Sequence, residues 1–339
     1  MPILRTTALG VGAAVAVRSL LRTRDEMDLR DSTVLITGAS RGLGFAMAER
    51  FGRDGARVAI CARSSEELAE AERHLERAGV NAFAVACDVT QSDQVASTVD
   101  LVLERFGRVD VLVNNAGVME VGPVGTLDAA GFAEAMDTMF WGVLHPTLAL
   151  IPSMRANGGG RIVNITSIGG KVSFPHLLPY NSAKFAAVGL SEGLHAELAR
   201  DAIRVVTVVP GFMRTGSHVN AGFRGSPRAE YGWFSIGGTT PLTSIDADRA
   251  ADRIVRATIR GEAEVTLSPQ AKVAARFAGL FPGLTADVLG AVNRVLPSAR
   301  GTVERRTGAE SESVVSRSFL TILGRRAART YHQLDERSA

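Results

Sequence analysis

The chain has 339 residues, of which 46% are hydrophobic and 22% charged, so it can bury a substantial core and is not disordered throughout. Its 38 Lys and Arg residues nearly balance its 35 Asp and Glu residues, which argues against a nucleic-acid surface. Cys61 and Cys87 offer neither a disulfide framework nor a metal-ligand spacing, so we expect a reducing compartment and no metal.

Residues 1–30 form an apolar and basic N-terminal segment. Residues 6–17 are small and apolar, and arginines flank this run at Arg5, Arg18, Arg22 and Arg24. The run is shorter than the ~20 residues that a membrane-spanning helix needs. Three interpretations stay open: a peripheral helix or short membrane anchor, a helix that packs on the protein or on another subunit, and an export signal.

From Ser32 onward, short apolar runs alternate with amphipathic stretches, the pattern of repeated β-α units around a parallel sheet. Strands are predicted at 34–37, 58–61, 82–87, 109–113, 161–166, 203–209 and 263–267. Helices are predicted at 44–52, 66–78, 91–106, 128–150, 180–200 and 246–260. We therefore expect an α/β fold in which one doubly wound, Rossmann-like parallel sheet forms a single main domain over residues 31–270.

Residues 216–240 interrupt this alternation. The segment carries aromatic residues among glycines and polar residues, namely Phe223, Tyr231, Trp233 and Phe234, and aromatic side chains indicate order. A loop of this length is usually functional. A substrate lid over a pocket is the favoured interpretation, and a merely structural insertion is the alternative.

The C-terminal region extends beyond the predicted sheet. Residues 271–298 contain two predicted helices, at 271–280 and 284–296, with Pro282 and Pro297 as their bounds. Residues 299–339 form a charged linker, with a mobile stretch expected at 299–317, and a basic amphipathic tail. The tail places apolar residues on one helical stripe, Phe319, Leu323, Ala327, Tyr331 and Leu334, opposite the basic residues Arg325, Arg326 and Arg329.

A glycine-rich turn follows the first predicted strand and opens the first predicted helix. Residues 37–44 are TGASRGLG. Gly38 allows a tight turn, Gly42 lets the backbone approach a diphosphate, and Gly44 allows close helix packing. The unpaired N–H groups of the helix N-terminus bind phosphate. Because any strand-to-helix turn can use glycine, a purely structural turn is the alternative.

The end of the second predicted strand carries the residues that distinguish the two nicotinamide cofactors. An NAD site usually has Asp or Glu there, whereas this chain has Cys61, Ala62, Arg63 and Ser64. Arg63 and Arg41 of the glycine turn are the residue type that clamps a 2′-phosphate. NADP(H) is therefore the expected cofactor, with two solvated surface arginines as the alternative.

Two further motifs follow strands at the edge where such sheets bind ligands. Asn114 to Gly117 is NNAG, and Tyr180 and Lys184 lie at i and i+4 of a helix, on one face. Ser167 follows the strand predicted at 161–166. An ammonium near a phenol stabilises the phenolate, whose ordinary pKa is ~10. A hydroxyl, an acidified phenol and a lysine are what carbonyl reduction requires, because the developing charge on oxygen must be hydrogen-bonded and then protonated.

With these motifs the chain resembles the short-chain dehydrogenase/reductase family, closely over residues 31–215 and by topology to about 268. The TGxxxGxG turn, Asp88-Val89, NNAG, YxxxK and the segment from Pro210 to Thr215 all match family motifs. The resemblance implies Tyr180 as general acid/base, Ser167 as the residue that orients the substrate, and Lys184 as the ribose ligand that lowers the pKa of Tyr180.

The glycine turn and the resemblance together assign the cofactor-binding residues. Met213 and Thr215 are expected at the nicotinamide carboxamide and Asp88 at the adenine. The whole expected set is Gly38, Ser40, Arg41, Gly42, Leu43, Gly44, Arg63, Ser64, Asp88, Val89, Asn115, Ala116, Gly117, Tyr180, Lys184, Pro210, Gly211, Met213 and Thr215.

One position departs from the family pattern. Many members carry an asparagine three residues before a glycine in the helix that precedes the active-site strand, where it helps to hold a water of the proton relay. This chain has Met139 before Gly142, and methionine cannot donate a hydrogen bond. His145 or His176 compensates only if one of them reaches the site.

We therefore expect an NADP(H)-dependent oxidoreductase that interconverts a carbonyl and an alcohol on an apolar small molecule. The alternatives are a relative that catalyses dehydration or epimerisation, and a cofactor-binding protein without turnover. The cofactor argues for a cytoplasmic protein and against export. A homodimer or tetramer is expected, and the two ends of the chain are expected either to contact a membrane surface or to pack on a partner subunit.

Overall fold

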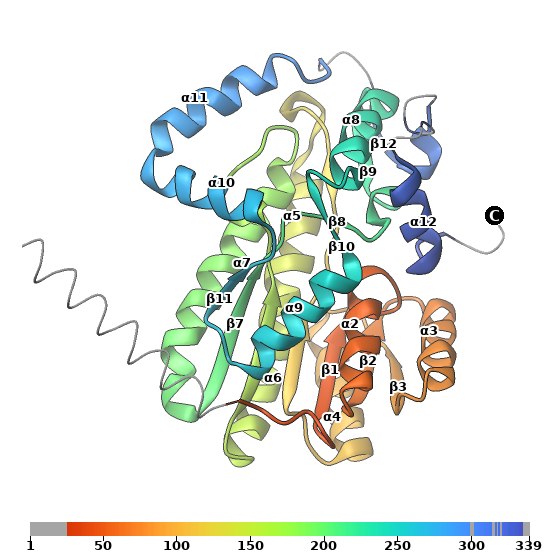
Figure 1. Ribbon diagram of the computed structural model, residues 1–339, viewed down its shortest axis with the longest axis vertical. Coiled ribbons are helices and arrows are strands. Elements are labelled where there is room, and N and C mark those ends of the chain that lie inside the picture. The colour runs from red at the N-terminus through yellow and green to blue at the C-terminus, as the bar shows by residue number, and fades with distance from the viewer. Residues whose placement is uncertain (1–25, 299–301, 314–315, 317, 319–320, 335–339) are drawn as a thin grey trace, which may run out of the picture.

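The computed structural model describes residues 26–298, 302–313, 316, 318 and 321–334. Figure 1 shows a central sheet with helices packed on both of its faces. Most of the N-terminal segment lies outside the described residues, so its three interpretations stay predictions. From Glu26 the chain runs along helix α9 (Ala247–Ile259), where the Met27 N–H donates to the Ile259 carbonyl at 3.0 Å.

Seven parallel strands form the main sheet in the order β11-β7-β6-β4-β1-β2-β3. Their bounds are β1 Thr33–Thr37, β2 Arg57–Ala62, β3 Ala82–Ala86, β4 Val111–Asn114, β6 Gly160–Ile165, β7 Ile203–Val209 and β11 Glu264–Thr266. The sequences of the central strands are almost continuously apolar, because helices bury these strands on both faces. The predicted doubly wound, Rossmann-like fold is confirmed.

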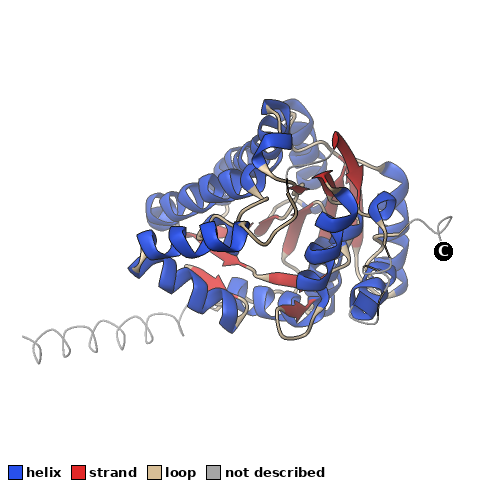
Figure 2. Cartoon of the chain, turned by 90° about the horizontal axis from the view of Figure 1, so that it is seen from above, coloured by secondary structure: helices blue, strands red, loops and turns tan. Residues whose placement is uncertain are grey.

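Helices cover the sheet in two layers, seen from above in Figure 2. Their bounds are α2 Gly42–Arg53 and α3 Ser65–Arg77, which join α9 on one face, and α4 Ser92–Phe106, α6 Gly142–Ala156 and α7 Leu178–Glu197 on the other. Each layer closes its own hydrophobic core against the sheet. Phe51 of α2 and Ile254 of α9 lie in one core, and Val102 of α4 and Leu150 of α6 lie in the other.

The single helix predicted over 128–150 is interrupted. Asp128 caps α5 (Ala129–Met136), and a π-helical stretch (Asp137–Trp141) separates α5 from α6. Met139 of this stretch is fully buried in a small core with Ala135 and Ala183. Hydrophobic periodicity did not reveal the interruption, because the apolar pattern continues through it.

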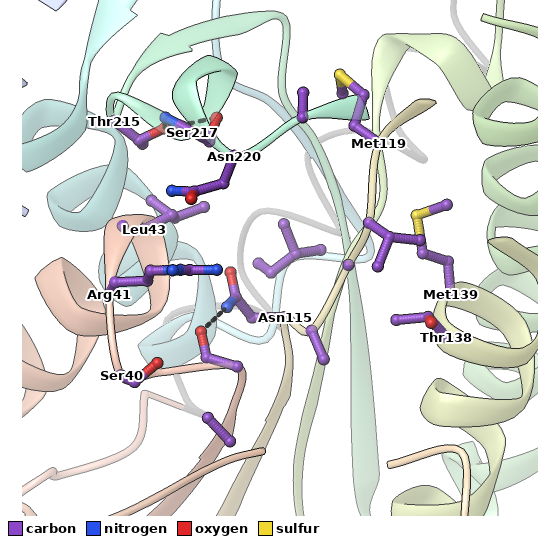
Figure 3. A pocket seen from close by; sticks show the side chains of 18 of the residues that line it. Ser40, Arg41, Leu43, Asn115, Met119, Thr138, Met139, Thr215, Ser217 and Asn220 are labelled. Carbon is purple, nitrogen blue, oxygen red and sulfur yellow. Dashed lines mark hydrogen bonds between the residues drawn. The ribbon is translucent and has the colours of Figure 1, made fainter. Parts of the chain in front are cut away.

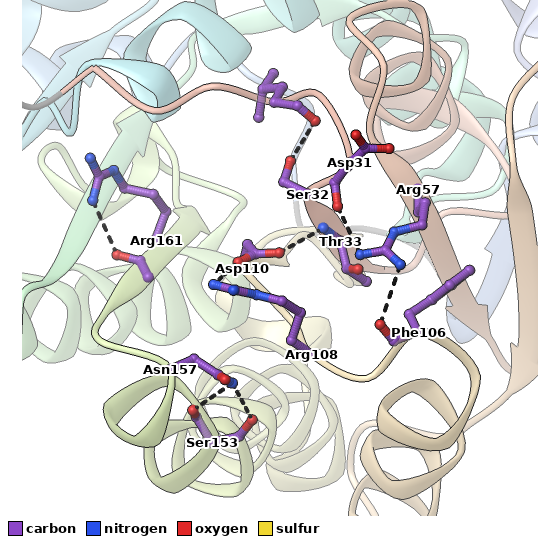
Figure 4. Close-up of polar contacts among 12 residues, drawn as sticks. Asp31, Ser32, Thr33, Arg57, Phe106, Arg108, Asp110, Ser153, Asn157 and Arg161 are labelled. Carbon is purple, nitrogen blue, oxygen red and sulfur yellow. Dashed lines mark hydrogen bonds and ion pairs between the residues drawn. The ribbon is translucent and has the colours of Figure 1, made fainter.

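The amino-terminal edge of the sheet is held by polar contacts (Figure 4). The buried Asp110 carboxylate accepts a hydrogen bond from the Thr33 N–H at 2.8 Å and pairs with Arg108. Arg57 donates to the backbone carbonyls of Asp31 at 2.7 Å and Phe106 at 3.3 Å. These contacts satisfy backbone groups at this edge of the sheet. Sheets of this kind bind ligands at the opposite, carboxyl edge.

The segment 216–240 is ordered, as its aromatic residues predicted. It contains β9 (Gly222–Gly225) and α8 (Pro227–Thr239), and β9 pairs with β5 (Glu120–Val121). Phe223, Tyr231 and Phe234 are buried together in a third core above the sheet. A parallel pair, β8 (Phe212–Arg214) and β10 (Ser244–Asp246), connects this part to the main sheet.

The charged stretch 299–317 differs from the linker that we expected. It contains β12 (Thr302–Thr307), which pairs antiparallel with β9. A charged composition does not prevent backbone pairing, and edge strands commonly carry charged side chains. The prediction of a mobile linker is therefore wrong for residues 302–307.

The basic tail also folds back on the chain. Its helix α12 (Ile322–Thr330) buries Ala327 and Ala328, and Tyr331 follows it in the core beside α2 and α9. The predicted stripe is thus buried in this chain at Ala327 and Tyr331 and exposed at Leu323. Phe319 lies outside the described residues.

Two further helices, α10 (Pro269–Leu280) and α11 (Pro282–Asn293), confirm the predicted pair. Figure 1 shows them projecting beyond the helical layers. Only Ala271 is buried in α10, and α11 contains no buried residue. Among the described residues no helix is both long enough and apolar enough to cross a membrane.

Candidate active site

A cavity of about 660 Å³ opens at the carboxyl edge of the sheet. In Figure 3 the glycine turn with Ser40, Arg41 and Leu43 forms one side of the cavity, and Thr138 and Met139 form the opposite side. Ser167 and every residue of the expected cofactor set except Gly44 line it. Gly44 packs behind the turn, where an added Cβ would lie 2.4 Å from the Gly38 carbonyl oxygen.

The glycine turn is held in place by the NNAG motif. The Thr37 hydroxyl accepts hydrogen bonds from the N–H groups of Asn115 and Ala116, and the Asn115 amide donates to the Gly38 carbonyl at 2.8 Å. Gly38 has φ +63°, and a Cβ there would lie 2.7 Å from the Ala116 Cα. Only glycine meets both conditions. The two motifs therefore form one rigid unit.

Helix α2 begins at Gly42 and points its N-terminus into the cavity. The helix has no side-chain cap and no acidic residue in its first turn. An uncapped helix N-terminus presents free N–H groups and the positive end of the helix dipole. This end of the cavity is therefore suited to a phosphate or another anion.

An acidic residue that the sequence motif did not predict lies beside the two arginines. Glu67 of α3 accepts hydrogen bonds from Arg41 Nη1 and from the Ser40 hydroxyl, each at 2.9 Å. The residues at the end of β2 indeed include no acid, but the first turn of α3 brings Glu67 to the cavity wall. Arg63 is exposed, lines the same wall and makes no ion pair within the described part of the chain. Ser64 caps α3 through the Glu67 N–H at 3.2 Å.

Ser167, Tyr180 and Lys184 converge at the other end of the cavity. The Ser167 side chain lies beside the Tyr180 hydroxyl and lowers the pKa of that phenol. Lys184 Nζ donates to the Ile165 carbonyl at 2.7 Å and lies 5.7 Å from the centroid of the Tyr180 ring. The i, i+4 spacing on α7 thus places both side chains on the cavity, as predicted.

Burial controls the ionisation of this group. It raises the pKa of Tyr180, and the Ser167 side chain opposes that rise. Burial also lowers the pKa of Lys184 to about 8. We expected Lys184 to lower the pKa of Tyr180, and here burial dominates instead.

The turn after β6 approaches α7 closely because it contains Gly169 and Gly170. A Cβ on Gly170 would lie 2.5 Å from the Lys184 carbonyl oxygen. The Ser167 hydroxyl accepts a hydrogen bond from the Gly169 N–H at 3.0 Å, which orients it. The position of Ser167 against α7 therefore depends on Gly169 and Gly170 as well as on Ser167, Tyr180 and Lys184.

Met139 lies at the cavity wall in the position where many relatives have asparagine. Its sulfur faces Gly117, and its side chain is fully buried. Neither histidine compensates for it. His145 Nδ1 contacts the Val89 carbonyl at 3.1 Å, and His176 Nδ1 contacts both Glu230 carboxylate oxygens at 3.0 Å. Neither lines the cavity.

Several lining residues carried no signal in the sequence. Ser217 and Asn220 come from the expected lid segment, whose lid role stays a prediction. Arg305 of β12 reaches the rim and pairs with Glu134 of α5 at 2.6 Å. Gln333 lies at the far end of the chain from the glycine turn that it contacts. Long-range folding brings these residues together, so no local spacing marks them.

This sheet order, with a helix N-terminus that has no side-chain cap at the carboxyl edge, defines the class of doubly wound nucleotide-binding α/β proteins. The chain belongs to the short chain dehydrogenase family, whose model matches residues 32–222. The family resemblance seen in the motifs is confirmed, and the protein is an oxidoreductase of that family.

Individual relatives agree with this assignment. The chain is 35% identical over 254 residues to the 11-beta-hydroxysteroid dehydrogenase A of Sesamum indicum, which covers 73% of this chain and 71% of the relative. A variant of the actinorhodin polyketide ketoreductase, solved with NADPH, has a TM-score of 0.59 and 32% identity and covers 72% of this chain and 92% of its own. A short chain dehydrogenase/reductase from Burkholderia phymatum, solved with NAD, has a TM-score of 0.70 at 24% identity over 76% of this chain and 96% of its own. This last likeness concerns the fold alone.

Proposed function

We propose that the protein is an NADP(H)-dependent oxidoreductase that interconverts a carbonyl and an alcohol on an apolar small molecule. The observation that carries this proposal is the convergence of Ser167, Tyr180 and Lys184 on one end of a cavity whose other end is the glycine turn. A nicotinamide dinucleotide, when bound, supplies or accepts the hydride. The residues of the chain bind it, orient the substrate and move the proton.

The proton transfer follows from the environment of Tyr180. Its raised pKa keeps the phenol protonated at neutral pH, so Tyr180 donates its proton to the substrate oxygen during reduction. The Ser167 hydroxyl, which lies beside Tyr180, stabilises the negative charge that develops on that oxygen. Lys184 stabilises the phenolate left on Tyr180. In the oxidation direction the same phenolate takes a proton from the alcohol.

The cofactor set supports binding of a dinucleotide. The residues proposed to hold it are those of the expected set, with the diphosphate at the start of α2 and the nicotinamide near Met213 and Thr215. The N-terminus of α2, which has no side-chain cap, fits an anion. NADPH in the actinorhodin ketoreductase variant, which is 32% identical to this chain, supports a nicotinamide cofactor.

A preference for NADP(H) over NAD(H) rests on the two arginines. Arg63 lines the cavity without an ion pair among the described residues, which leaves its guanidinium for a 2′-phosphate. Arg41 shares its charge with Glu67, so its contribution is smaller than the motif alone predicted. Arg41 and Arg63 thus share this wall with the Glu67 carboxylate, and the Asp88 carboxylate also lines the cavity.

The substrate end of the cavity carries a group of apolar side chains beside Thr138 and the rim pair of Arg305 and Glu134. Val118 and Met139 line it and belong to the same small core as Tyr180, and Met119 and Ala221 extend its wall. Such a surface favours a substrate whose carbonyl lies on an apolar body. The resemblance in sequence to a hydroxysteroid dehydrogenase supports the same class.

Oxidation of NADPH against a panel of apolar ketones and aldehydes tests this proposal. The wild type is expected to turn over at least one of them, and Tyr180→Phe is the matched inactive control. If the protein binds NADPH and turns over none of the panel, it is a cofactor-binding protein without turnover. A co-purified ligand identified by mass spectrometry would narrow the substrate class.

We also propose a cytoplasmic protein that contacts an anionic membrane surface through α10 and α11. Apolar residues form an exposed stripe along both helices: Val273, Phe277, Leu280, Phe281, Leu284, Val288 and Val292. The basic residues Lys272, Arg276 and Arg294 outnumber the one acid, Asp287. An apolar stripe with flanking cations is typical of helices that lie at anionic interfaces.

The membrane contact proposed here lies on α10 and α11, whereas the sequence led us to expect it at the two ends of the chain, including the basic C-terminal tail. The tail buries Ala327 and Tyr331 against its own chain, so that part of its apolar stripe cannot lie on a bilayer or on another subunit. The alternative is that the exposed stripe on α10 and α11 forms an interface between copies of the chain in a homodimer or tetramer. Flotation with liposomes distinguishes the two.

A further inference from the structure

The C-terminal residues 322–334 cross the rim of the cofactor cavity. Helix α12 packs closely on the lid segment, because a Cβ on Gly216 would lie 2.3 Å from the Ala328 Cα. The chain then passes over the glycine turn. The Tyr331 hydroxyl donates to Asp248 of α9 at 2.9 Å, which holds the end of the segment.

The segment caps the first residue of helix α2. The Gly42 N–H donates to the Tyr331 carbonyl at 2.8 Å. A carbonyl from the C-terminus thus takes one N–H of an otherwise uncapped helix. The N–H groups of Leu43 and Gly44, next along the helix, carry no side-chain cap and remain for an anion.

Gln333 follows Tyr331 and lies directly on the turn. Only 7% of this residue is exposed, and it lines the cavity. Its Nε2 is 2.6 Å from the point where a Cβ on Gly42 would lie, so any side chain at position 42 would displace the amide.

The orientation of the Gln333 amide follows from its neighbour. Asn220 Nδ2 donates to the Gln333 backbone carbonyl at 2.9 Å and to Gln333 Oε1 at 2.8 Å. A carbonyl oxygen can only accept, so the Asn220 amide has one consistent orientation, and Gln333 Oε1 must face it. Gln333 Nε2 is then turned toward Gly42 and the cavity. Within the described residues it has no hydrogen-bond acceptor.

We propose that Gln333 is a cofactor-binding residue, whose Nε2 donates to the diphosphate of the bound dinucleotide at the start of α2. Residues 322–334 then act as a strap that holds the dinucleotide in the cavity, with Asn220 as the residue that positions the Gln333 amide. The inference rests on the proposed dinucleotide binding. An oriented, nearly buried N–H donor beside a phosphate-binding helix end has no other partner in the described chain.

The test measures nucleotide binding and release without turnover. We would titrate NADPH into the full-length wild type, Gln333→Ala, Gln333→Glu and, as a matched control on the same segment, Thr330→Ala, whose side chain is exposed. Loss of a hydrogen bond to a charged group is expected to weaken binding by about tenfold or more in Gln333→Ala. Gln333→Glu is expected to lose more, because a carboxylate repels the diphosphate. Release of NADPH, followed by stopped flow, is expected to be faster in both.

Nucleotide fragments separate a direct contact from a loosened fold. ADP-ribose contains the diphosphate, whereas adenosine 2′-monophosphate lacks it. The Gln333 variants are expected to weaken ADP-ribose and to leave adenosine 2′-monophosphate unchanged. Equal losses for both fragments, unchanged binding of NADPH, or tighter binding in the variants would each overturn the proposal, and the last would mean that the segment obstructs the site. If the wild type binds neither NADPH nor NADH, the proposed function fails instead.

Discussion

The Glu67 carboxylate accepts a hydrogen bond from the Arg41 guanidinium at 2.9 Å, at the cavity wall that also carries Arg63. This pair places an acid where the motif at the end of β2 has none. Both charges are about one-third exposed, so solvent screens their interaction. The choice between NADP(H) and NAD(H) therefore depends on a balance of charges and not on a single arginine.

Changing Glu67 and Arg63 is predicted to move cofactor preference in opposite directions. Arg63→Ala is expected to reduce the preference for NADPH over NADH by about tenfold or more, because a charge-assisted contact is lost. Glu67→Gln frees Arg41 and removes a negative charge, so it is expected to tighten NADPH binding by about two- to fivefold. Calorimetric titration of both cofactors measures these changes.

Glu66→Gln is the matched control for Glu67→Gln, because Glu66 lies in the same helix turn, is exposed and does not line the cavity. It is expected to behave as the wild type. Tighter binding of NADH than of NADPH by the wild type would contradict the preference itself.

Tyr180→Phe is predicted to abolish turnover while leaving NADPH affinity near that of the wild type. The substitution keeps the ring and removes the proton donor, a loss that typically costs about 10²–10⁴-fold in rate. Lys184→Met is expected to reduce cofactor affinity as well as rate. Steady-state kinetics with parallel NADPH titrations separate the two effects. Substantial activity in Tyr180→Phe would mean that the proton comes from another group.

The stability of the protein without cofactor is predicted to rise with pH between about 8 and 10.5 through Lys184. Its folded pKa is lowered to about 8 from an ordinary value of 10.5. In this window Lys184 is protonated in the unfolded chain and neutral in the folded chain. The free energy of unfolding therefore rises with pH, by at most about 1.4 kcal/mol per pH unit.

Urea unfolding at several pH values measures this dependence. Other groups titrate in the same range, so the informative quantity is the difference between the wild type and Lys184→Met. The variant is expected to lack the part of the rise that Lys184 contributes. Identical pH profiles for the two proteins would show that the lysine does not titrate in this way.

Charge and apolar surface on α10 and α11 are predicted to control membrane binding. Val273, Leu280 and Val288 are exposed, and their joint replacement by serine is expected to abolish flotation with anionic liposomes at low salt. High salt is expected to weaken binding of the wild type, because it screens the flanking cations. If the wild type stays with the soluble fraction at low salt and the triple variant changes its oligomeric state, the stripe is an interface between copies.

The sequence alone determined the sheet and most of the site. Continuous apolar runs mark strands that helices bury on both faces, and glycines mark the turn between β1 and α2. The pair Tyr180 and Lys184 is set by helix geometry, which places i and i+4 on one face wherever the helix lies. These features depend on residues that are near one another in the chain, so they can be recognised without the fold.

Only the tertiary structure decided which distant residues complete the site. Glu67 reaches Arg41 because α3 packs beside α2, and β12 forms because β9 offers it an edge. Gln333 meets Gly42 across almost the whole length of the chain. The pKa of Tyr180 also follows from burial and not from its spacing to Lys184. Contacts and desolvation of this kind arise only when separate elements pack together, and no local pattern encodes them.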